Sequence, residues 1–211
     1  MEPAVRTRAE FEHELQSLRQ DVLTLGSMVE KSVARAVDAL KRRDLELAQH
    51  VIESDQEIDE RTYALEEKAL LLIARQQPLA TDLRTIAATL FIISELERIG
   101  DYAEGMAKIA QRLADQPPLK PLLDIPRMAD LAIEMLRGSL DAFVDRDLET
   151  CRAIWQRDDE LDALYDQVYR ELLTYMMSDP ATIERATLLL WTAHNLERIG
   201  DRVTNICERI A

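Results

Sequence analysis

The chain has 211 residues, of which 40 are Asp or Glu and 26 are Lys or Arg, so its formal net charge is −14. This acidic balance argues against nucleic-acid binding, because an overall negative field repels a phosphate backbone. No apolar stretch approaches the roughly 18 residues of a membrane span, and the first residues lack the apolar core of a secretory signal. We therefore expect a cytoplasmic protein with no membrane insertion and no nucleic-acid partner.

Several enzyme signatures are absent from the sequence. It contains no Gly-rich dinucleotide motif, no P-loop and no nucleophile elbow, and it has only three His residues. Cys151 and Cys207 form no metal-type pair, and we interpret them as small buried hydrophobic residues. The missing motifs argue against nucleotide-binding, dinucleotide-binding and Ser-hydrolase enzymes and leave other classes open, and we expect a protein that is not an enzyme.

Apolar residues recur at helical spacing along the chain, and no alternating strand pattern occurs. The pattern predicts six helices, at about 7–43, 45–77, 79–113, 123–146, 148–178 and 181–210. Four of the seven Pro residues crowd between the third and fourth helices, which predicts a stiff linker at about 115–126. The short connections elsewhere make neighbouring helices antiparallel. The predicted fold is therefore all-α, with two tandem antiparallel three-helix bundles over residues 1–115 and 116–211.

The second half of the sequence repeats the first. Residues 36–59 match residues 139–162, and the segment LERIGD at 96–101 recurs unchanged at 196–201. A repeat of this size indicates one supersecondary unit that is used twice.

Carboxylates four residues apart recur in both copies, on the two helices that flank each predicted hairpin turn. The candidates are Asp55, Asp59, Glu97 and Asp101 in the first copy, and Asp158, Asp162, Glu197 and Asp201 in the second. Residues four apart share one face of a helix. Asp59 and Glu97 lie equally far from Pro78 along the chain, so facing helices bring them to the same level.

Four carboxylates at one level repel one another unless a cation lies among them. Oxygen donors suit hard or borderline ions such as Mg, Mn, Fe or Zn, so the eight acids are candidate metal ligands. Asn205 lies four residues after Asp201 and is a ninth candidate, whereas its counterpart Gly105 carries no ligand atom.

Other residues of the repeated motif have structural interpretations. Gly100 and Gly200 lie inside predicted helices, where Gly is unfavourable, so we expect close helix packing there. Arg98 and Arg198 follow the Glu of each motif and are expected either to brace the carboxylates or to mark a surface. His194 could add a ligand but is interpreted as structural.

The duplicated LERIGD motif, its DxxxD partner motifs and the two three-helix units make this sequence resemble the PhoU family, the accessory and regulatory proteins of phosphate-specific transport. The resemblance covers roughly residues 15–211 and is strongest in ERIGDYAEGMAKIA and ERIGDRVTNICERI. It implies an all-α homodimer with multinuclear metal clusters on the two E-x3-D faces, with Fe or Zn first and Mg or Mn as alternatives. Gly105 departs from the Asn expected there, so the first cluster would be less complete.

The resemblance also implies a role. Family members associate, on the cytoplasmic side of the inner membrane, with the ATPase of a phosphate ABC transporter and with a sensor histidine kinase. There they help to repress the phosphate-starvation response. The same role is expected of this chain.

Three other functions stay open on the sequence alone. The protein could serve another phosphate carrier, or it could be a structural adaptor whose acids are merely solvated. The third is a carboxylate-bridged di-metal oxidase, which takes two Glu-x-x-His motifs. This sequence contains one such motif, Glu10 to His13, and it lies near an end of a helix rather than at the acidic level.

Overall fold

A computed structural model describes residues 8–210. They form α1 (Arg8–Arg42), α2 (Leu45–Gln76), α3 (Ala80–Leu113), α4 (Asp124–Asp145), α5 (Leu148–Ser178), the short 3-10 helix η1 (Pro180–Thr182) and α6 (Ile183–Ile210). The predicted all-α class is confirmed, and each predicted helix is present. The last helix begins slightly later than predicted because Pro180 starts a 3-10 turn.

Buried side chains follow the helical spacing from which the helices were predicted. On α1, Leu18, Val22, Leu25 and Val29 are all fully buried, three or four residues apart. Burying an aliphatic side chain of this size stabilises the fold by roughly 1.5–3 kcal/mol. This apolar stripe therefore fixes which face of α1 is turned inward.

Equivalent Asp side chains cap the N-terminus of the second helix in each repeat. The carboxylate of Asp44 accepts a hydrogen bond from the Leu47 amide at 2.9 Å and caps α2. Asp147 accepts from the Glu149 and Thr150 amides and caps α5 in the same way. These caps satisfy amide groups that the helix itself leaves unpaired, so α2 and α5 begin at a defined residue.

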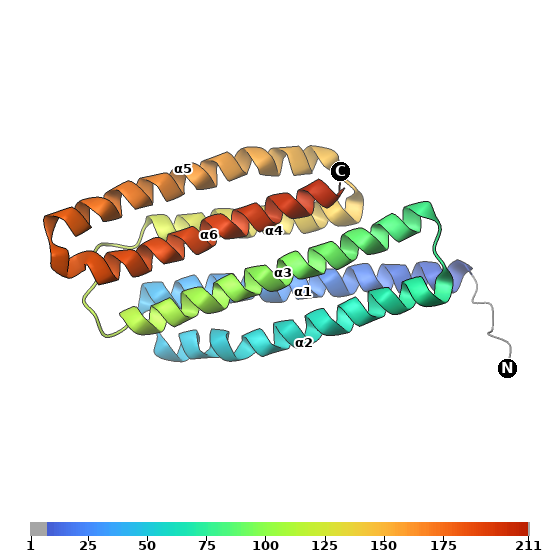
Figure 1. Cartoon of the computed structure of the whole chain (residues 1–211), viewed down its shortest axis with the longest axis horizontal. Coiled ribbons are helices and arrows are strands. Elements are labelled where there is room, and N and C mark those ends of the chain that lie inside the picture. The colour runs from blue at the N-terminus through green and yellow to red at the C-terminus, as the bar shows by residue number, and fades with distance from the viewer. Residues whose placement is uncertain (1–7, 211) are drawn as a thin grey trace.

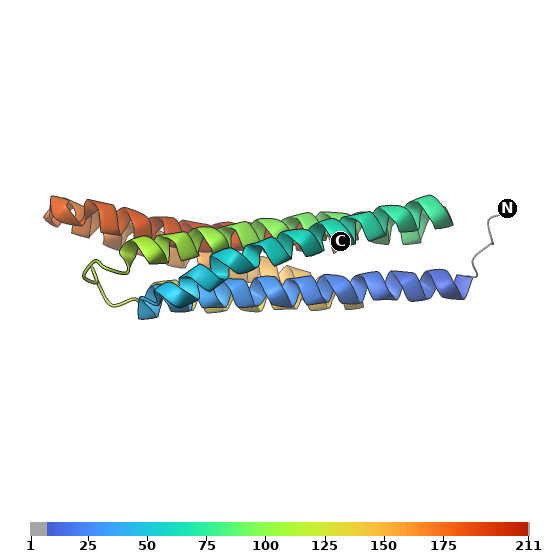
Figure 2. The same cartoon turned by 90° about the horizontal axis from the view of Figure 1, so that it is seen from below.

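The six helices form two antiparallel bundles, α1–α3 and α4–α6, that lie side by side (Figure 1). The bundles meet where α3 packs against α6 and where α1 packs against α4. Figure 2 shows α1 and α4 in one layer and α3 and α6 in the other. One continuous hydrophobic core runs through both bundles. This lengthwise packing was not predicted from the sequence, and the boundary between residues 115 and 116 stays a prediction.

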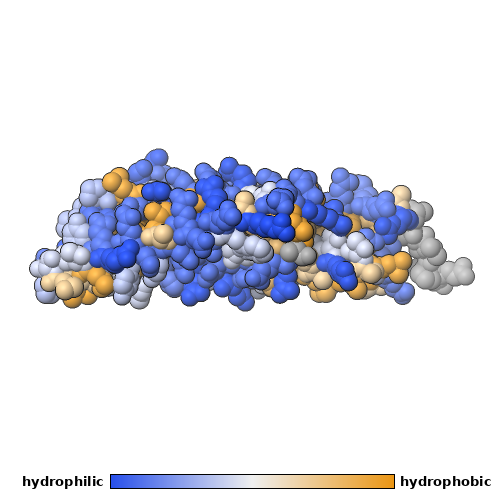
Figure 3. Space-filling model, turned by 90° about the horizontal axis from the view of Figure 1, so that it is seen from above, coloured by the Kyte–Doolittle hydropathy of each residue, from blue (hydrophilic) through white to orange (hydrophobic). Residues whose placement is uncertain are grey.

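The face of the molecule on which α5 lies is predominantly hydrophilic (Figure 3). On the side where α5 lies, apolar residues gather only in small separate patches (Figure 3). Among the helices between residues 8 and 210, none combines the length and the apolar character needed to cross a bilayer.

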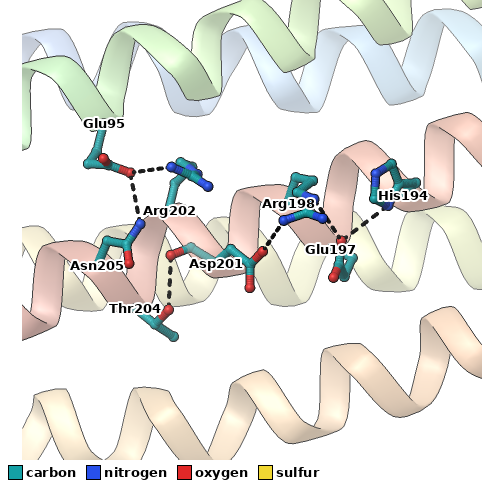
Figure 4. A network of polar contacts seen from close by, with 8 residues as sticks. All are labelled: Glu95, His194, Glu197, Arg198, Asp201, Arg202, Thr204 and Asn205. Carbon is teal, nitrogen blue, oxygen red and sulfur yellow. Dashed lines mark hydrogen bonds and ion pairs between the residues drawn. The ribbon is translucent and has the colours of Figure 1, made fainter.

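A buried ion pair crosses the contact between the two repeats. Glu95 on α3 is only 4% exposed, yet it carries a carboxylate. Arg202 on α6 lies 3.4 Å from its Oε2 atom, and the amide of Asn205 donates a hydrogen bond to the same oxygen at 3.3 Å (Figure 4). A buried charge is costly unless it is paired, so this contact specifies how α3 and α6 align.

We expect Glu95→Ala to destabilise the protein by about 3 kcal/mol, because it leaves the Arg202 charge largely buried and without its carboxylate. Urea unfolding followed by circular dichroism measures the change, with Glu57→Ala at an exposed position of α2 as the control. Equal unfolding midpoints for the two variants would contradict a structural role for the pair.

Candidate metal-binding site

Each repeat carries one cluster of carboxylates on two facing helices. The first acidic cluster consists of Asp55 and Asp59 on α2 with Glu97 and Asp101 on α3, and the second consists of Asp158 and Asp162 on α5 with Glu197 and Asp201 on α6. The members of each pair are four residues apart and therefore project from one side of their helix.

The carboxylates of the first acidic cluster act on one another across the two helices. Burial, followed by the negative charge of Asp59, raises the pKa of Asp55 to about 6, and Asp101 on the facing helix contributes. Burial is also the main cause that raises the pKa of Glu97, and Asp59 again acts from the other helix. The two helices thus bring these acids together, as their equal distance from the turn predicts.

Glu104 strengthens the negative field of the first acidic cluster. Its charge contributes to the raised pKa of both Asp55 and Asp101, while Lys108 lies 2.6 Å from Glu104 and opposes that effect. Glu104 lies three residues after Asp101 on α3, so helical spacing brings it to the side of the helix that carries Asp101.

The second acidic cluster repeats this arrangement. Burial and then Asp162 raise the pKa of Asp158 to about 6, with Asp201 and Glu197 on the facing helix contributing. Burial and then Asp201 raise the pKa of Asp162. Acidic side chains on two helices therefore share one partly desolvated region in this repeat as well.

The two motif glycines allow the facing helices to approach closely. A Cβ atom on Gly200 would come within 2.6 Å of the Asp158 Oδ1 atom, which is less than a van der Waals contact. A Cβ atom on Gly100 would lie 3.4 Å from the Asp55 Oδ1 atom. These contacts support the sequence interpretation that Gly occurs here because the helices pack closely beside the acids.

Basic side chains of α6 hold the acids of the second cluster in place (Figure 4). Arg198 donates a hydrogen bond to Asp201 at 2.9 Å, which is the bracing role predicted from the sequence. His194 and Arg198 lie 3.3 Å and 3.6 Å from the Glu197 Oε2 atom. That oxygen is buried, and within the described part of the chain it accepts no hydrogen bond.

Asn205 lies at the contact between the repeats rather than among the carboxylates. Its amide nitrogen points to Glu95 on α3, as described above. In the first repeat, Gly105 occupies the equivalent position, and a Cβ atom there would lie 3.4 Å from the amide nitrogen of Asn195. Both positions therefore belong to the α3–α6 contact, and a ligand role for Asn205 stays a prediction.

The donor chemistry of both clusters fits a cation, although the side chains would have to come closer together to hold one. As they stand, no three Asp, Glu, His or Cys side chains between residues 8 and 210 are arranged to hold a metal ion. The donors are carboxylates, which suit hard and borderline cations. The raised carboxylate pKa values, and the buried Glu197 oxygen that accepts no hydrogen bond in the described part of the chain, mark groups that a positive charge would stabilise.

The remaining candidate residues lie elsewhere. Glu10 and His13 are exposed in the first turns of α1 and join neither acidic cluster. Cys151 on α5 and Cys207 on α6 are both buried, as predicted. Burial raises the pKa of Cys207 well above its ordinary value, so its thiol stays protonated at neutral pH.

Comparison with known proteins identifies relatives of the whole chain. The PhoU domain model matches residues 22–110 and again 125–210. The phosphate-specific transport system accessory protein PhoU homolog of Caulobacter vibrioides is 44% identical over 201 residues, covering 95% of this chain and 87% of the relative. The phosphate-specific transport system accessory protein PhoU of Escherichia coli is 38% identical over 95% of this chain and 83% of its own length.

Solved structures share the same fold. PhoU from Pseudomonas aeruginosa superposes with a TM-score of 0.90 at 36% identity, covering 95% of this chain and 96% of that one. The phosphate transport system regulatory protein PhoU from Streptococcus pneumoniae gives a TM-score of 0.88 at 32% identity, with coverage of 95% and 94%.

The raised carboxylate pKa values predict how stability depends on pH in chelator-treated protein. The pKa of Asp158 is about 6 in the folded state, against an ordinary value of 3.8. The folded state therefore binds more protons at Asp158 between these values, and the contribution of this group to stability falls as pH rises from about 4 to about 6. We expect Asp158→Asn to reduce this pH-dependent loss of stability by about 1–2 kcal/mol, after allowing for solvent screening.

Urea unfolding at pH 4, 5, 6 and 7 in the presence of EDTA measures this dependence. Asp141→Asn, on an exposed position of α4, is the matched control and is expected to keep the slope of the unmodified protein. The same slope in Asp158→Asn as in the control would contradict the raised pKa of Asp158.

Proposed function

This chain belongs to the PhoU family, and we propose that it is a regulatory accessory protein of phosphate uptake whose two acidic clusters bind metal ions. One observation carries the metal-binding part of this proposal: four carboxylates share a partly desolvated region between facing helices in each repeat. The relatives' names, which describe accessory proteins of a phosphate-specific transport system, support the transport role.

The proposed ligands are the carboxylates of the two clusters, with Asn205 as an additional oxygen donor in the second. Oxygen donors accept Fe, Zn, Mg and Mn. Fe or Zn are the first candidates because the family resemblance implies them, with Mg or Mn as alternatives. A bound cation would supply positive charge that offsets the repulsion within each cluster. In the second cluster, Arg198 orients Asp201, and Gly200 lets α5 approach α6.

We further propose that the protein acts without catalysis, as an adaptor between the ATPase of a phosphate ABC transporter and a sensor histidine kinase. It would repress the phosphate-starvation response when phosphate is plentiful. In this role it would be a cytoplasmic homodimer, held at the inner membrane only through its partners. Service to another phosphate carrier is the alternative within the same family.

Each acidic cluster should lose its metal independently of the other. We expect Glu97→Gln with Asp101→Asn to lower the metal content of protein purified without chelator by about half, because each repeat holds one cluster. Glu197→Gln with Asp201→Asn should do the same, and all four changes together should reduce it to background. Elemental analysis by mass spectrometry measures the content.

The control for metal content is Asp130→Asn with Asp141→Asn, which removes two exposed carboxylates from α4. Circular dichroism verifies that every variant is folded. Metal content in the fourfold variant equal to that of the control would refute the ligand assignment.

The signalling role has a separate genetic readout. In a strain that lacks this gene, we expect a phosphate-starvation reporter to be active in phosphate-rich medium. The unmodified gene should repress the reporter and the fourfold carboxylate variant should not. Deleting the phosphate ABC transporter as well distinguishes the two family roles, because an effect that persists without that transporter indicates another carrier. A reporter unaffected by loss of the gene would contradict the signalling proposal.

A further inference from the structure

A basic cavity lies away from both acidic clusters, where the two repeats meet. Its volume is about 620 Å³, and its walls come from α1, the first part of α3, the end of α4 and the end of α6. Four arginines line it: Arg19, Arg84, Arg146 and Arg209. Such a concentration of positive charge is notable in a chain whose formal net charge is −14.

The guanidinium groups of this arginine cavity have few acceptors. Arg146 donates a hydrogen bond to the hydroxyl of Thr85 at 3.1 Å. The guanidinium of Arg209 lies over the ring of Phe91, 4.1 Å from its centroid. The Nε atom of Arg19 is buried, and no acceptor in residues 8–210 pairs with it.

Acidic residues contribute little to neutralising this cavity. Asp82 acts on Arg19, but its carboxylate accepts a hydrogen bond from Arg8 at 2.7 Å. Burial, followed by the positive charge of Arg146, lowers the pKa of Arg19, which is the effect expected where two cations are held close together.

The internal repeat shows what such an arginine does when oxygen atoms are within reach. Arg43 is the first-repeat counterpart of Arg146, and both follow the first helix of their repeat in the left-handed conformation, with φ of 60° and 56°. Arg43 donates to the carbonyl oxygens of Ala114 and Gln116, at the start of the linker between the repeats.

The remainder of the linker completes that first-repeat site. Arg185 donates to the carbonyl oxygen of Pro117 at 2.9 Å, and linker residues 116–123 line the cavity beside Arg43. Linker carbonyl oxygens therefore accept hydrogen bonds from Arg43 of the first repeat and from Arg185 on α6. Around Arg146, no described segment supplies carbonyl oxygens to the guanidinium groups.

We propose that the arginine cavity binds a compound carrying several phosphate groups, whose oxygens take the place that the linker carbonyls hold in the first repeat. Guanidinium groups pair with phosphate oxygens through two parallel hydrogen bonds, and they do so more strongly than with neutral acceptors. A cavity of this volume accommodates a ligand the size of a nucleotide or an oligophosphate. The site is independent of the acidic clusters, so it does not rest on metal binding.

Calorimetric titration of the full chain, with EDTA present to remove metal from the acidic clusters, tests the proposal. The probes are sodium tripolyphosphate, ATP and inorganic phosphate, with sulfate as the reference anion. We expect saturable binding of tripolyphosphate or ATP, with one site per chain, and weaker binding of sulfate. Binding of ATP but not of tripolyphosphate would indicate that the ligand needs an organic group. Binding of tripolyphosphate but not of ATP would indicate an inorganic chain.

Two substitutions locate the site. Arg146→Gln and Arg84→Gln should each weaken binding about 10- to 100-fold, as expected for loss of a charged hydrogen bond. Gln is compatible with the backbone at residue 146, because Gln77 adopts the same left-handed conformation in this chain. Arg84 is exposed, so its substitution leaves the core intact.

Arg170→Gln is the matched control, because it removes one positive charge from an exposed position of α5 outside the cavity. Its affinity should equal that of the unmodified protein. Absence of binding by all the phosphate probes would overturn the proposal. Affinities lowered equally in the control, or sulfate bound as tightly as tripolyphosphate, would overturn it too, because either result indicates nonspecific charge attraction.

Discussion

The packing of α3 against α6 is the contact on which the rest of the structure depends. Each of these helices carries one copy of the LERIGD segment, so equivalent helices of the two repeats meet at the contact between the bundles. Glu95 reaches across this contact to Arg202 and Asn205, and a charge buried in this way tolerates few other alignments. The interface therefore sets how one acidic cluster is placed relative to the other.

Charge is sorted along this framework rather than spread evenly. The acidic clusters lie between α2 and α3 and between α5 and α6, where burial and then like charges raise carboxylate pKa values. Four arginines gather instead where the end of α6 meets α1, α3 and the end of α4. Holding like charges together costs free energy in both places, and the continuous apolar core supplies the stability that permits it. Such regions are where a chain of this kind can bind ions of opposite sign.

The features that the sequence predicted correctly are local or follow from the repeat. Helical periodicity located the six helices, and equal chain distances from a turn placed the carboxylates at the same level, because rise per residue is constant in a helix. The lengthwise packing of the bundles could not be predicted, since a repeat does not specify which faces meet. Glu95 was missed for the same reason, because its partners lie on the other repeat. The four arginines of the cavity come from four segments that are far apart in the chain, and no spacing rule connects them.

The two repeats differ at equivalent positions whose side chains have different partners. Gly105 and Asn205 are equivalent, yet only Asn205 reaches across to Glu95. Arg43 and Arg146 share a backbone conformation, yet only Arg43 is satisfied by the linker. A linker must follow the first repeat to reach the second, so its carbonyl oxygens are always present beside Arg43. Among the described residues no such segment lies beside Arg146, so the arginines around it are the ones whose hydrogen bonds a ligand can accept.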